Sequence, residues 1–192
     1  MRAEQKTSLT RNCIAVLAHL TIVVASANAQ EITELPKIGD ALSALASSRG
    51  VAVREGWTET FPNAPTDASF TSFAAGIGVI PFQAQVFGVN NDVVAAAILF
   101  DGSAFRARRG AAASVEDCHL AFSSLFRMMT LAHGRPDLPP KEVGSNNLGQ
   151  TTFTLPGLRQ GVLFGSFEAA DCTVAAFYGN ATALQIIGQD IR

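Results

Sequence analysis

The sequence contains few of the residue types that bind metals or act as catalytic groups. It has three histidines and three cysteines in 192 residues. His119 and His133 stand 14 positions apart on one predicted helix, about 21 Å along its axis, which is too far apart to bind one ion together. Zinc motifs of the H-E-x-x-H type, Cys/His clusters, haem-attachment motifs and calcium-binding loops are absent. We therefore expect neither a metal nor a cofactor.

Nucleophile and nucleotide-binding motifs are also lacking. No G-x-S-x-G or S-x-x-K motif stands at a predicted strand-to-helix turn. Gly76-Ile77-Gly78 is followed by Val79-Ile80-Pro81 and not by a helix, so it does not match a dinucleotide-binding loop. These absences favour a non-catalytic protein. The alternative is an envelope hydrolase with an unrecognised site, in which His119 is the first candidate because it is expected on an exposed helix face.

Charge is scarce as well. Charged residues make up 16% of the chain against 48% hydrophobic residues, and the formal net charge is −2. Without residues 1–29, which hold three basic residues and one acidic residue, the chain has 11 basic and 15 acidic residues and a net charge near −4. So small a charge gives no electrostatic reason to expect nucleic acid or an anionic membrane as a partner.

The N-terminal residues have the three parts of a secretory signal peptide. Arg2, Lys6 and Arg11 precede an apolar run over residues 13–25, and Ala27-Asn28-Ala29 forms a small-residue cleavage site. The run is shorter than the roughly 20 residues that a membrane-spanning helix needs. We therefore expect cleavage near Ala29, no membrane span afterwards, and a location in the periplasm or outside the cell. Residues 30–192 have the length of a single domain.

Two cysteines, Cys118 and Cys172, follow the expected cleavage site. In an oxidising compartment an even number of cysteines favours a disulfide. The alternative is two unpaired thiols that are buried as small hydrophobic groups. The sequence therefore predicts a Cys118–Cys172 bond because of the expected compartment.

The clearest element is an amphipathic helix over about residues 115–133. Ser114 is a good N-cap with Asp117 three residues later, and Gly134 is a good C-terminal residue. Apolar residues recur every three or four positions between them: Val115, Cys118, Phe122, Leu125, Met129 and Ala132. This spacing places Cys118 on the buried side of the helix. A disulfide would then hold the helix across the strand face that carries Cys172.

The remaining patterns predict an α+β domain with a mostly antiparallel sheet and helices packed on one face. Phe82–Val86 alternates as a strand with one buried face should, and a turn at Gly88–Asp92 joins it to an apolar strand at Val93–Phe100. The other expected elements are a helix over Pro36–Ser48, a short strand at Val51–Arg54, a loop over Phe61–Asp67, an exposed basic segment at Phe105–Gly110, a connector over Asp137–Asn147, strands near Phe153–Leu155, Val162–Phe167 and Cys172–Tyr178, and a short final helix capped by Asn180. The segment Phe70–Ile80 remains ambiguous.

Two features suggest where a binding surface could lie. All 13 phenylalanines follow residue 29, and alternation puts Phe82 and Phe87 on opposite faces of one strand. Aromatic rings outside the helix-facing core could line an apolar pocket, but the favoured interpretation is an ordinary second core layer over the far face of the sheet. Arg106, Arg108 and Arg109 precede the long helix and could bind an anion or an acidic partner there, the alternative being a solvated loop.

These observations lead to one functional hypothesis and two alternatives. We expect a small exported, non-catalytic protein that binds an apolar small molecule or another envelope protein. An unrecognised hydrolase and a structural accessory subunit of an envelope complex are the alternatives. An accessory subunit would use the arginine segment or an exposed aromatic patch for its contacts.

Overall fold

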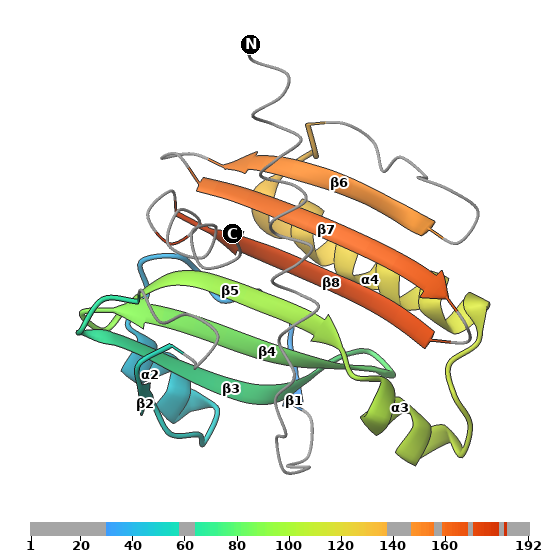
Figure 1. Ribbon diagram of the computed structural model, residues 1–192, viewed down its shortest axis with the longest axis horizontal. Helices are drawn as coiled ribbons and strands as arrows, with labels where there is room; N and C mark the ends of the chain where they lie inside the picture. Colours follow the sequence, from blue (N-terminus) through green and yellow to red (C-terminus); the bar gives the residue numbers. More distant parts are fainter. Residues whose placement is uncertain are drawn as a thin grey trace.

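The computed structural model describes residues 30–57, 64–137, 147–155, 159–168, 171–180 and 183 (Figure 1). The predicted signal peptide lies outside these residues, as do parts of the predicted loop and connector and most of the predicted final helix. No helix in the described part of the chain is both long enough and apolar enough to cross a membrane.

The described residues form an eight-stranded sheet and three helices, so the predicted α+β class with a mostly antiparallel sheet is confirmed. The helices are α2 (Leu42–Ser48), α3 (Gly102–Arg109) and α4 (Val115–His133). The strands are β1 (Gln30–Glu31), β2 (Arg54–Glu55), β3 (Ala68–Ile77), β4 (Ile80–Val89), β5 (Asp92–Phe100), β6 (Asn147–Leu155), β7 (Arg159–Glu168) and β8 (Asp171–Gly179).

The sheet consists of two three-stranded meanders joined at their last strands. The strand order is β1-β3-β4-β5-β8-β7-β6, and β2 pairs with β3 beside β1. Only the β1–β3 pair is parallel among these described pairs. Strands β5 and β8 meet at the centre, which joins the two halves of the chain into one continuous sheet (Figure 1).

The hairpin between β4 and β5 forms as the sequence predicts. Asn90 and Asn91 both have positive φ, 52° and 68°, as the two central residues of a type I′ turn require. The ambiguous segment before it is strand β3, which turns tightly into β4 through Gly78, whose φ is 58°. Its two glycines therefore belong to a strand end and a turn and do not interrupt a helix.

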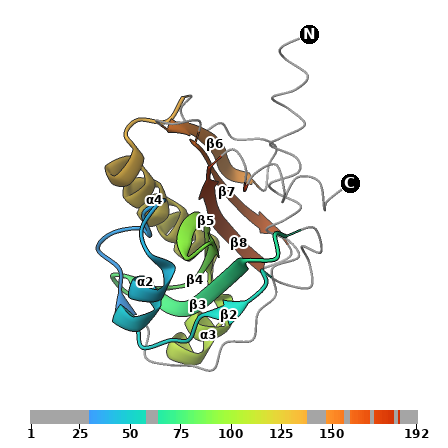
Figure 2. The ribbon, with the colours of Figure 1, turned by 90° about the vertical axis from the view of Figure 1, so that its left-hand side faces the viewer.

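Helices α2 and α4 lie on the same side of the sheet, which we call the helix face (Figure 2). Helix α4 packs over β6, β7 and β8, and its N-terminal half is bonded to β8 by the Cys118–Cys172 disulfide. The predicted disulfide is therefore confirmed. Cys172, Val174 and Ala176 share this face, as the sequence predicts, because alternate residues of a strand point to the same side.

Two glycines of β7 let α4 lie close to the sheet. A Cβ atom at Gly165 would lie 2.5 Å from Cδ2 of Phe122, and one at Gly161 would lie 3.1 Å from Cε of Met129. Phe122 and Met129 thus occupy the space that side chains on β7 would otherwise fill. The disulfide and the two glycines together define the position of α4 on the helix face.

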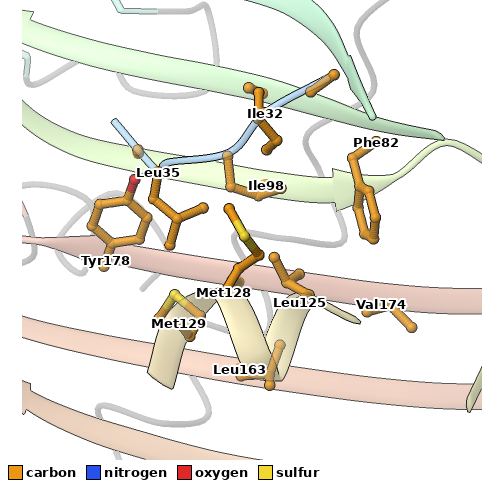
Figure 3. Packing of buried hydrophobic residues seen from close by; sticks show 14 of the residues in the cluster. Ile32, Leu35, Phe82, Ile98, Leu125, Met128, Met129, Leu163, Val174 and Tyr178 are labelled. Carbon is orange, nitrogen blue, oxygen red and sulfur yellow. The ribbon is translucent and has the colours of Figure 1, made fainter. Parts of the chain in front are cut away.

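The core of the helix face is built from both meanders and from α4. Figure 3 shows Leu125 and Met128 of α4 among Ile98 of β5 and Leu163 of β7. Tyr178 of β8 is fully buried beside Leu35, and its hydroxyl donates a hydrogen bond of 2.7 Å to the Pro36 carbonyl (Figure 3). The segment before α2 is thereby fastened to the centre of the sheet.

The predicted helix over Pro36–Ser48 is wrong in its first half, because α2 begins only at Leu42. The preceding residues pair with the start of β5: Gly39 N–H donates to Val93 O (2.8 Å), and Val93 N–H donates to Asp40 O (2.9 Å). Gly39 has a φ of 93°, which is outside the helical region. The predicted strand at Val51–Arg54 also moves, since the paired residues are those of β2.

The basic segment expected to be an exposed loop is helix α3. Asp101 caps it by accepting a hydrogen bond of 2.8 Å from the Ala104 N–H. Phe105 anchors it in the core, in ring contact with Phe100 at 5.6 Å. One buried ring and one cap are enough to fix a helix whose other side chains are mostly exposed.

Residue Asp137 covers part of the outer edge of β6. Its N–H donates to Thr152 O (2.9 Å), and its carboxylate accepts hydrogen bonds from Thr154 N–H (3.2 Å), Thr152 Oγ1 (3.2 Å) and Thr154 Oγ1 (2.9 Å). A strand with one unpaired side otherwise offers these backbone groups to another chain. One residue of the same chain therefore occupies the place of a neighbouring strand.

Replacing Gly165 by alanine should destabilise the fold. The added methyl group would clash with the Phe122 ring, and such overpacking costs about 1–3 kcal/mol. Urea denaturation measures the loss in the free energy of unfolding. Gly76→Ala is the matched control, since the nearest atom to its added Cβ would be the Gly78 carbonyl oxygen at 3.7 Å. Equal losses in the two variants would contradict the close packing of α4.

Removing the disulfide should lower stability more strongly. The two cysteines are 54 positions apart, and cross-linking a loop of that length stabilises by about 4 kcal/mol in the chain-entropy model. The Cys118→Ala/Cys172→Ala variant should unfold at a lower urea concentration than the oxidised protein. Wild-type protein treated with a reductant is the control, and its unfolding midpoint should lie at the same urea concentration as that of the double variant. An unfolding midpoint that does not change on reduction would contradict this expectation.

Candidate binding cleft

A cleft of about 800 Å³ opens between the segment that precedes α2 and the C-terminal end of α4. Its two walls come from residues almost 90 positions apart in the sequence, and both lie on the helix face. The lining residues are Thr33, Glu34, Leu35, Pro36, Lys37, Ile38, Asp40, Met128, Leu131, Ala132 and His133.

The first wall is held in place by Tyr178. Its hydrogen bond to Pro36 O fixes the segment that carries Leu35 and Ile38, and Leu35 is buried in the core. Burial raises the pKa of the Tyr178 hydroxyl well above its ordinary value. The hydroxyl therefore remains protonated and able to donate throughout the physiological pH range.

The second wall is the last part of α4. Met128 is largely buried, whereas 74% of the Leu131 side-chain and backbone surface is exposed. The His133 ring, at the end of the helix, contacts the Tyr178 ring at 4.9 Å with an angle of 57° between the planes. Both walls thus contact Tyr178, the first through the Pro36 carbonyl and the second through the His133 ring.

Three charged side chains line the cleft, Glu34, Lys37 and Asp40, and two of them form an ion pair. Lys37 Nζ lies 2.9 Å from a carboxylate oxygen of Glu34. This hydrogen bond and the opposite charge raise the pKa of Lys37 and lower that of Glu34, and the charge of Asp40 acts on Lys37 in the same direction. Both side chains of the pair are exposed, so the pair adds little stability. Together with Asp40, these side chains give the charged part of the lining a net charge of −1.

The three arginines singled out in the sequence do not line this cleft. Arg106, Arg108 and Arg109 are exposed in the last turn of α3, where positive charge complements the helix dipole. The Arg109 guanidinium lies 5.9 Å from the centre of the Phe105 ring. The first turn of α4 beside them carries two acidic residues of its own. An anion site there stays a prediction.

The start of α4 is closed by a capping box. Asp117 N–H donates to Ser114 Oγ (3.2 Å), and Ser114 N–H donates to the Asp117 carboxylate (2.9 Å). The bond from the Ser114 backbone holds the pKa of Asp117 below its ordinary value, and the Ser114 hydroxyl and the charge of Arg109 act in the same direction. Backbone N–H groups that an anion would need are thus partly used by the protein itself.

The cleft was not predicted from the sequence, although exposed apolar residues of α4 could have indicated it. Leu120 and Leu131 are apolar residues outside the predicted buried stripe of α4, and both are exposed in the structure. Two stripe members, Val115 and Ala132, are exposed as well, whereas Met128 is buried. An apolar residue on the otherwise polar side of a helix can indicate a binding surface. Leu131 is such a residue, and it lines the cleft.

Little in the described residues suggests a catalytic or metal centre. His119 is exposed on α4, and His133 packs against Tyr178. No three His, Cys, Asp or Glu side chains in this part of the chain lie close enough together to hold a metal ion. Comparison of the chain with protein-family models, with curated proteins and with solved structures finds no match.

The capping box makes stability depend on pH. Because folding lowers the pKa of Asp117, its contribution is present above the unfolded value of about 3.8 and is lost as the pH falls through the folded value. Asp117→Ala should lower the free energy of unfolding by about 0.3–1.5 kcal/mol at pH 7, a fall of about 1–6 °C in the melting temperature.

The difference between Asp117→Ala and wild type should shrink towards pH 3. Glu116→Ala is the matched control, because it removes a charge from the same helical turn but not the box. Melting curves between pH 3 and pH 7 make this comparison. A difference that widens towards acid pH, or equal losses in the two variants, would contradict the role of the box.

Proposed function

We propose that this is a small, exported, non-catalytic binding protein whose cleft takes an apolar small molecule. The observation that carries the proposal is the cleft itself, about 800 Å³ in volume and lined by apolar side chains together with a few polar and charged ones. Small-molecule sites commonly have volumes of about 300–1,000 Å³ and are lined mainly by apolar side chains with a few polar groups. Leu35, Ile38, Met128 and Leu131 supply the apolar lining.

Export is part of the proposal. Residues 1–29 have the composition of a signal peptide with cleavage near Ala29, and the Cys118–Cys172 bond is compatible with an oxidising compartment. The mature protein would be residues 30–192, a single domain in the periplasm or outside the cell. Native mass spectrometry of protein isolated from that compartment would detect a bound molecule as extra mass that is lost on denaturation.

A second candidate function is docking to another envelope protein. Exposed leucines favour it: Leu131 is 74% exposed and Leu120 is 49% exposed, both on α4. A partner that covered both leucines would remove their apolar surface from water. A hydrolase would instead depend on His119, and an accessory subunit on Arg106, Arg108 and Arg109, so alanine variants at these positions separate the alternatives.

A charge in the cleft should weaken binding of an apolar probe. We expect Leu131→Asp to reduce the affinity for N-phenyl-1-naphthylamine by roughly tenfold or more, since covering the exposed Leu131 side chain with the probe contributes up to about 1.5–3 kcal/mol. Leu120→Asp is the matched control, an exposed leucine of the same helix that does not line the cleft. It should keep its affinity within about twofold of wild type. Fluorescence titration measures both.

Three outcomes would decide against the cleft. Wild-type protein that fails to bind the probe would exclude it as an apolar binding site. Equal losses in the Leu131 and Leu120 variants would show that the probe binds the helix surface and not the cleft. An activity that disappears in a His119→Ala variant would show that the protein is an enzyme.

A further inference from the structure

Asp40 is the charged side chain of the cleft lining that stands outside the ion pair. The other two, Glu34 and Lys37, bond to each other at 2.9 Å. Within the described part of the chain, no ion pair or side-chain hydrogen bond involves the Asp40 carboxylate. The Asp40 side chain is exposed, while its backbone carbonyl accepts a hydrogen bond from the Val93 N–H. The fold thus holds the backbone of Asp40 in place and leaves its carboxylate available to a ligand.

A second source of negative potential is the C-terminal end of helix α4. A helix carries partial negative charge on the carbonyl groups of its last turn. The Gly134 N–H bonds to Thr130 O at 2.9 Å, and the carbonyls that follow, including those of Leu131 and Ala132, have no partner within the helix. Leu131 and Ala132 both line the cleft. Both walls therefore favour a positive charge, one through a carboxylate and the other through the helix end.

The lining offers little to an anionic ligand. Lys37 is the only lysine or arginine among the lining residues, and its Nζ is already bonded to Glu34. An anion would have to displace Glu34 from Lys37 and would then lie close to that carboxylate. Arg135 follows the end of α4 but is not among the lining residues. The charges of the cleft thus discriminate between ligands of opposite sign.

We propose that the ligand of the cleft is an apolar molecule with a positively charged amino group, and that Asp40 selects for this charge. The inference rests on the proposed function, because it concerns the same cleft. The apolar part of the ligand packs against Ile38, Met128 and Leu131, and its ammonium group pairs with the Asp40 carboxylate near the helix end. A fatty acid of the same length would bring its carboxylate into the same negative potential. Asp40 is therefore a residue that determines specificity.

The test compares decylamine with decanoate, which have alkyl chains of similar length and opposite charges at pH 8. This pH also lies above the ordinary histidine pKa of about 6.5, so that an ordinary histidine adds no charge. Isothermal titration calorimetry of the mature protein, below the concentrations at which either compound forms micelles, gives both affinities. Decylamine should bind roughly tenfold more tightly than decanoate.

Two variants locate the effect. Asp40→Asn keeps the size of the side chain and removes its charge. It should lower the preference for decylamine to about twofold, since an exposed ion pair contributes up to about a factor of five in affinity. Its affinity for the uncharged probe N-phenyl-1-naphthylamine should stay as in wild type. Asp171→Asn is the matched control, because Asp171 is exposed at the start of β8, does not line the cleft and gives the same change in net charge. It should keep the tenfold preference.

The proposal is overturned if decylamine and decanoate bind equally, if decanoate binds more tightly, or if the two variants behave alike. Titration with N-phenyl-1-naphthylamine distinguishes this failure from that of the proposed function. Wild-type protein that binds the uncharged probe but does not discriminate between the two charged compounds retains the apolar cleft and excludes the role of Asp40. Protein that binds neither the probe nor decylamine excludes both.

Discussion

The close packing of α4 on β7 is the constraint on which the rest of the structure depends. Glycines at positions 161 and 165 leave room for Met129 and Phe122, and the disulfide from Cys118 holds the same helix to β8. The end of the helix is thereby brought beside the segment that Tyr178 fastens to the sheet. The cleft follows from these two attachments, one covalent and one a buried hydrogen bond.

Local patterns in the sequence were enough to predict what is locally determined. The spacing of apolar residues and the caps at Ser114 and Gly134 predicted α4 because a helix is fixed by contacts three and four residues apart. Asn90 and Asn91 predicted the hairpin turn because both tolerate positive φ. The disulfide followed from cysteine number and expected compartment, with no need for the fold.

Long-range contacts explain what the sequence did not reveal. An apolar stripe continues through Pro36–Ser48, but the first half is not helical, because the Gly39 N–H donates to Val93 O and the Val93 N–H donates to Asp40 O. The alternation of Phe82–Val86 predicted a strand with one buried face, and this is wrong, because Gln85 is fully buried and a second buried cluster that includes Trp57 and Phe87 lies on the other face of the sheet. Trp57 comes from a distant part of the chain, of which the alternation contains no information. The cleft likewise joins two segments whose proximity no local pattern encodes.

Asp137 determines which kind of recognition the β6 edge of the sheet allows. A peptide that adds to a sheet as a further strand bonds to outward C=O and N–H groups of the edge. At Thr152 O and Thr154 N–H those groups already bond to Asp137. Copies of the protein cannot join edge to edge at this point unless they first break these bonds. Contacts made there would depend on side-chain chemistry and not on a shared backbone ladder.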